Sequence, residues 1–198
     1  MLRMGNTPSS FIYTSQPMIM RPFEYFCPND IQIVNNSVAM AEEMVSNHFK
    51  LSATQLMNLN YDIKTLADLT NEEIVCDHFA QVIRYSVKKE NDVPGMPARD
   101  FYKICLQDHS IINAMKQNRE MDLFAFALYI VTHELIHVVR FQRFLQHFDA
   151  PAHEKNDEEV RVHVKTHEIL SKARMACLNP VFDFYEKWRT APADMENL

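Results

Sequence analysis

The sequence predicts a mainly α-helical protein built as a single helical domain. Its 198 residues include only two glycines, fewer than the many tight turns of a β-sandwich or barrel need. Apolar residues make up 47% of the chain, which is enough for a packed core at this length. Apolar side chains also recur at helical spacing in several segments. We expect residues 1–30 to be an arm packed on the body and residues 31–198 to be the helical domain.

The first half of this domain is expected to contain three helices. The first covers residues 33–49, with Asp30 or Asn35 as its cap. "SATQ" (52–55) and "TNEE" (70–73) have the spacing of capping boxes, so each is expected to start a helix.

The "TNEE" box is expected to open an amphipathic helix over residues 74–89, which ends in two lysines as the helix dipole prefers. The strand signal is weak: one short edge strand is considered near the N-terminus, at "SFIYTS" (10–15) or "DIQIV" (30–34).

The second half is expected to contain four more helices. "KKENDVPGMP" (88–97) and "FDAPAHEKND" (148–157) are predicted loops. Asp122 can cap the longest helix, and Asn179-Pro180 is expected to end the one before last. The predicted helices cover residues 98–116, 122–147, 156–176 and 181–188.

Charge and cysteine spacing exclude several classes of protein. The net charge is -6 and no long basic run occurs, so nucleic acid is not expected as a partner. The four cysteines are far apart and form no CxxC pair, which argues against a disulfide framework and against cysteine-ligated zinc. This usage favours a reducing compartment. The cysteines are Cys27, Cys76, Cys105 and Cys177.

No segment predicts a membrane location. The N-terminus has no apolar core of signal-peptide length. The most apolar run covers nine residues from Leu123 to Val131 and then meets His133, Glu134 and Arg140. It is too short and too interrupted to span a bilayer. We therefore expect a cytoplasmic protein without a membrane partner, and the oligomeric state stays open.

The segment "IVTHELIHVV" carries the strongest chemical signal. His133 and His137 are four residues apart, so on a helix they share a face and can bind one metal ion. Glu134 is then free to act as a base on a water that the metal activates. The flanking residues are apolar on nearly all sides, and burying a carboxylate without a partner costs several kcal/mol. A bound divalent cation would offset the cost of burying that carboxylate and the two histidines.

This stretch resembles the extended signature of the zincin metallopeptidases. The resemblance implies that His133 and His137 bind zinc and that Glu134 is the catalytic base. The metzincin branch would need a glycine at residue 140 and a histidine at residue 143, where this chain has Arg140 and Arg143. The gluzincin branch takes its third ligand, a glutamate, from a later helix.

The later segment "NDEEVRVHVKTHEIL" (156–170) offers that ligand. Glu159 follows His137 by 22 residues, and His163 shares its helix face. Gluzincins often carry an aspartate at this second position, so His163 is a departure that could hold Glu159, stabilise an anionic intermediate or bind metal. Glu159 is the first candidate for third ligand and His163 the second, ahead of Glu158 and His153. The isolated histidines are expected at the surface or in interfaces: His48, His78 and His109.

Three functions remain in view. The first is a zinc-dependent hydrolase, most simply a peptidase acting on a peptide or protein substrate, with Glu134 and His163 in the chemistry and with His167, Tyr129 or Tyr13 as further donors. The second is a metal-stabilised helical protein that binds a partner, which the twelve methionines would suit. The third, a di-iron carboxylate protein, would need a second E-x-x-H pair, and the Glu159–His163 spacing does not supply it.

Overall fold

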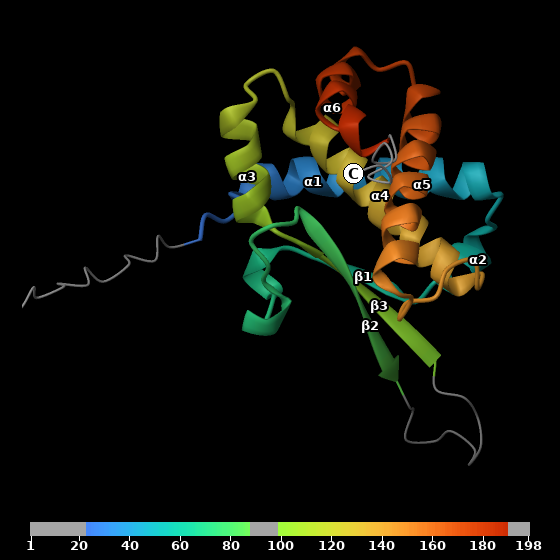
Figure 1. Ribbon diagram of the computed structural model, residues 1–198. Coiled ribbons are helices and arrows are strands. Elements are labelled where there is room, and N and C mark those ends of the chain that lie inside the picture. Colours follow the sequence, from blue (N-terminus) through green and yellow to red (C-terminus); the bar gives the residue numbers. More distant parts are fainter. Residues whose placement is uncertain (1–22, 88–98, 190–198) are drawn as a thin grey trace, which may run out of the picture.

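The computed structural model describes residues 23–87 and 99–189 (Figure 1). This part of the chain is mainly helical, as predicted, and it also contains a three-stranded sheet that the sequence analysis did not expect. Four short 3₁₀ turns, η1 to η4, join the longer elements. The helices are α1 (Pro28–Phe49), α2 (Ala53–Met57), α3 (Asp108–Gln117), α4 (Leu123–Gln142), α5 (Ala152–Ser171) and α6 (Asn179–Phe184), and the strands are β1 (Tyr61–Lys64), β2 (Ala80–Val87) and β3 (Arg99–Leu106).

Helix α4 is the centre of the core. The Asp122 carboxylate accepts a hydrogen bond from the Ala125 N–H at 3.1 Å and caps the helix, as expected. Between Ala125 and Val139, Glu134 is the one side chain that is not fully buried. A helix that is apolar all round is stable only when other elements cover it. Here α1, α5, α6 and the sheet do so (Figure 1).

By length and composition α4 could cross a membrane, which differs from the expectation that its apolar run is too short. Other parts of the protein cover this helix, however, and 83% of its most apolar 18-residue stretch is buried. The core helix of a globular domain passes the same composition test, so the burial accounts for the apolar sequence.

Helix α1 begins at Pro28, earlier than predicted, and includes "DIQIV", which is therefore not a strand. Asp30 contributes to the cap from the third helical position, where its carboxylate accepts from the Cys27 N–H at 2.9 Å. Ser37 donates to the Phe124 carbonyl of α4 at 2.9 Å. "SATQ" forms the predicted capping box of α2.

The predicted helix over residues 74–89 is wrong. The "TNEE" capping box forms, but it closes only the single turn η2 (Asn71–Glu73), and the chain then enters β2. Residues 80–87 include β-branched and aromatic side chains that suit a strand. Over so short a run their apolar spacing fits the helical period and the strand period alike. Pairing with a strand distant in the sequence makes the segment a strand.

The predicted helix over residues 98–116 is half wrong, because its first part is β3 and only α3 is helical. β3 is the central strand: it pairs in parallel with β1 and antiparallel with β2. Tyr102, Ile104 and Leu106 alternate along it and are buried. Strand β2 is therefore an edge strand of this sheet.

Two further predictions concern the ends of the chain. Asn179-Pro180 begins α6, whereas it was expected to end the preceding helix, which stops at Ser171. This correction follows from proline's preference for the first turn of a helix. Part of the expected arm is described: the Phe26 N–H donates to the Asp108 carboxylate at 3.0 Å. "SFIYTS" and "KKENDVPGMP" lie outside the described residues.

A buried carboxylate fixes the start of β2. Glu73 accepts from Lys103 Nζ at 2.5 Å, from Tyr85 Oη at 2.6 Å and from the Thr70 N–H at 2.8 Å. Its main-chain carbonyl accepts from the side-chain amides of Gln81 and Gln107, each at 2.9 Å. These bonds tie η2 to the sheet and so set where residues 77–82 pass over α4.

Candidate metal centre

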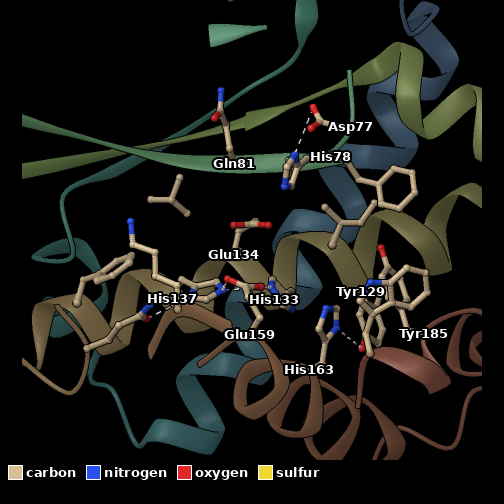
Figure 2. A pocket seen from close by; sticks show the side chains of 18 of the residues that line it. Asp77, His78, Gln81, Tyr129, His133, Glu134, His137, Glu159, His163 and Tyr185 are labelled. Atoms are coloured by element: carbon tan, nitrogen blue, oxygen red, sulfur yellow. Dashed lines mark hydrogen bonds and ion pairs between the residues drawn. The ribbon is translucent and has the colours of Figure 1, made fainter. Parts of the chain in front are cut away.

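Three side chains from two helices converge on one point (Figure 2). His133 and His137 lie one turn apart on α4, and both are buried. Glu159 reaches them from α5: its Oε2 lies 3.2 Å from His133 Nε2, and its Oε1 lies 3.3 Å from His137 Nε2. The two Nε2 atoms are 3.1 Å apart. The chain thus brings together the three residues that the sequence predicted as metal ligands.

These donor atoms lie close enough together to share one small ion. Ligands about 2.0 to 2.2 Å from a tetrahedral zinc ion are about 3.3 to 3.6 Å from one another. The two Nε2 atoms are 3.1 Å apart, and the two Glu159 oxygens lie 3.2 and 3.3 Å from one Nε2 atom each. With one donor atom taken from each residue, the three atoms lie within 4.8 Å of one another. Two imidazole nitrogens and one carboxylate are also a common catalytic donor set for zinc. The residues present therefore fit the group that the sequence implies.

The histidines and the carboxylate of this cluster shift one another's pKa values. Burial disfavours the charged forms, yet the contact with Glu159 raises the pKa of His137 to about 9. Burial also opposes the charge of Glu159, but the two histidines lower the pKa of this carboxyl well below its usual range. A proton shared between His137 and Glu159 balances the carboxylate without metal. A divalent cation at the same point would replace that proton.

Glu134 is not part of the cluster. It points from α4 toward β2, on the side of the helix that faces a pocket (Figure 2). Burial raises the pKa of its carboxyl, and the neighbouring histidines partly oppose that change. A carboxylate whose pKa lies above its ordinary value is better suited to accept a proton near neutral pH.

The pocket has a volume of about 490 Å³. Its floor is α4, and β2 with the residues before it forms the opposite wall (Figure 2). Aromatic side chains line one end, where the rings of Tyr129 and Tyr185 stack with centroids 4.1 Å apart. The ligand cluster and Glu134 both open onto this pocket.

His163 lies next to the cluster and is a neighbour of the ligands. Its ring lies tilted against that of His133 with centroids 4.3 Å apart, and its Nδ1 forms a 3.1 Å hydrogen bond with the Tyr129 hydroxyl. Burial lowers the pKa of His163 to about 3, so the ring is neutral. Three donor atoms within 4.8 Å of one another come from His133, His137 and Glu159 without it.

The lower-ranked ligand candidates have other contacts. Glu158 is buried and pairs with Arg140 and Arg161, so α5 turns this carboxylate away from the cluster. His153 is exposed beside Glu154. The Arg140–Glu158 pair joins α4 to α5 one turn past the site.

Sequence reasoning missed two groups of site residues. His78 is exposed, as expected for a surface or interface residue, but it also lines the pocket together with Asp77 and Gln81, all from the segment that was predicted as helix (Figure 2). Gln146, from the loop after α4, places its Oε1 3.2 Å from His137 Nδ1. No local pattern signals either group, because both depend on the path of a loop or strand in space.

Comparison of this chain with protein-family models, with curated proteins and with solved structures gives no match in any of the three.

Proposed function

We propose that this protein is a zinc-dependent hydrolase of the zincin type, with a peptide or protein substrate. One observation carries the proposal: one donor atom each from His133, His137 and Glu159 lies within 4.8 Å of the other two, and Glu134 stands beside them on the pocket side. The resemblance of "IVTHELIHVV" and the later glutamate to gluzincins supports the same assignment. Zinc, when bound, would lower the pKa of a coordinated water toward 7.

The chain's own residues have separate roles in this proposal. His133, His137 and Glu159 hold the metal. Glu134 accepts a proton from the attacking water and passes it to the leaving group. The neutral His163, held by the Tyr129 hydroxyl, stays beside the ligands as a hydrogen-bonding group for negative charge that develops in the pocket.

Within the described residues one edge of strand β2 is unpaired, and this edge is suited to bind a substrate in an extended conformation. The Phe79 carbonyl accepts from the Gln107 N–H at 2.9 Å, so residues 79 and 81 turn their main-chain groups toward β3. Ala80 and Val82 then turn theirs to the other edge, where no strand of the described chain pairs with β2. Both residues line the pocket. A peptide could add here as a further strand above Glu134.

Metal content and peptide cleavage test this function together. Protein purified without chelator is expected to hold about one zinc per chain and to cleave members of a mixed quenched-peptide library. A chelator should abolish cleavage and added zinc should restore it. Protein that holds zinc but cleaves nothing in the library would favour the alternative, a metal-stabilised helical protein that binds a partner. Protein that holds two irons would instead favour a di-iron carboxylate protein.

A further inference from the structure

We propose that Gln146 is a positioning residue that aims His137 at the metal, and that Arg84 of β2 holds the loop that carries it. The inference rests on the proposed metal binding. The first link is the 3.2 Å contact between Gln146 Oε1 and His137 Nδ1. When His137 binds metal through Nε2, its Nδ1 carries the proton and donates it to this amide oxygen.

No equivalent contact exists for the other histidine. His133 Nδ1 is buried and has no hydrogen-bond partner within residues 23–87 and 99–189. Outer hydrogen bonds fix the tautomer and the ring orientation of a ligand histidine. Among the described residues, Gln146 is therefore the only one that gives this support to the histidine pair. Its removal should strongly weaken zinc binding.

The loop between α4 and α5 is fastened to the pocket strand. Arg84 Nη2 lies 2.8 Å from Asp149 Oδ2, and the Arg84 guanidinium stacks 4.8 Å from the centre of the Phe148 ring. Phe148 in turn packs on Phe141 of α4 with ring centroids 5.1 Å apart. Gln146 and Phe148 both line the pocket. The contacts of Arg84 thus hold the loop at the distance from α4 that places the Gln146 amide on His137.

Zinc affinity, measured by competition with a coloured chelator, tests the first link. Gln146→Leu keeps the size of the side chain but removes the acceptor, and it should raise the dissociation constant for zinc about 10- to 100-fold. Gln146→Glu restores an acceptor and should bind within about threefold of wild type. Gln142→Leu is the matched control, because Gln142 ends α4 and its amide donates to the Leu59 carbonyl, outside the site.

Two further measurements separate positioning from general damage. The metal-free Gln146→Leu protein should melt at the wild-type temperature, and its cobalt form should show shifted visible bands because the ligand field has changed. Arg84→Ala should weaken zinc binding less than Gln146→Leu, and the double variant should be no weaker than Gln146→Leu alone, since both act through one contact.

The outcomes are distinct. Wild-type zinc affinity in Gln146→Leu would overturn the positioning role and leave the metal site intact. Additive losses in the double variant would overturn the link through Arg84. A wild-type chain that binds no zinc would overturn the proposed function and this inference with it.

Discussion

His163 Nδ1 lies 3.1 Å from the hydroxyl of Tyr129, one helical turn along α5 from Glu159. The two candidates for third ligand therefore have different polar contacts: the Glu159 carboxylate reaches both candidate ligand histidines, and His163 hydrogen-bonds with a tyrosine. This difference leads to the first prediction.

Glu159→Ala should weaken zinc binding by about a hundredfold or more, because it removes one of three protein ligands. His163→Gln should bind zinc within about threefold of wild type and lose activity. Isothermal titration with zinc measures the affinity of both variants, and peptide cleavage measures their activity. If His163→Gln weakened zinc binding more than Glu159→Ala did, His163 would be the third ligand.

Glu134→Gln should separate binding from turnover. The amide keeps the size of the carboxylate but cannot accept a proton, so the variant should retain its zinc and lose turnover by about a hundredfold or more. Metal analysis and peptide cleavage on the same preparation give both results. Loss of zinc in this variant would show that Glu134 is itself a ligand.

Removing the metal should destabilise the fold, since the ion joins α4 to α5 and the unfolded chain offers no assembled site. A chelator should lower the melting temperature by several degrees for a domain of this size. His137→Ala should show a similar drop and no further response to chelator. His153→Ala, on the exposed start of α5, is the matched control and should respond like wild type. Equal melting of the zinc-loaded and chelated protein would mean that packing alone holds the two helices.

Glu73 should make stability depend on acid pH. Hydrogen bonds from Lys103, Tyr85 and the Thr70 N–H lower the pKa of its carboxyl from 4.5 to about 2. The folded state thus binds its proton more weakly than the unfolded state, so this contribution is complete above pH 4.5 and is lost as the pH falls toward 2. The gap in unfolding free energy between wild type and Glu73→Gln should narrow across that window in urea titrations. A gap that stays constant from pH 6 to about 3 would contradict the assignment.

The Arg140–Glu158 pair should be costly to break. Both side chains are largely buried, and Glu158→Ala leaves the guanidinium without its main partner, a change that typically costs about 3 to 5 kcal/mol. Glu168→Ala, which removes two exposed ion pairs, with Lys165 and Lys172, should cost less than about 1 kcal/mol. Urea titrations give the free energy of unfolding of each variant for this comparison. A similar small loss in both would show that Arg140 finds water or another acceptor.

The long helices could be read from the sequence because their signals are local. Asp122 and "SATQ" cap helices α4 and α2 as predicted, and the apolar surface of α4 required burial on all sides. The histidine pair of the candidate site was predictable for the same reason: four-residue spacing on one helix brings His133 and His137 to one face.

The tertiary structure decided the rest. Residues 80–87 satisfy helical and strand spacing alike, and only pairing with β3, which lies beyond residue 98, makes them a strand. That pairing places His78 and Gln81 over Glu134. The packing of α5 on α4 likewise turns Glu159 toward the histidines and Glu158 toward Arg140, although the two are adjacent in the chain. Neighbouring residues on a helix point about 100° apart, so the angle at which the helices pack selects which glutamate reaches the two histidines.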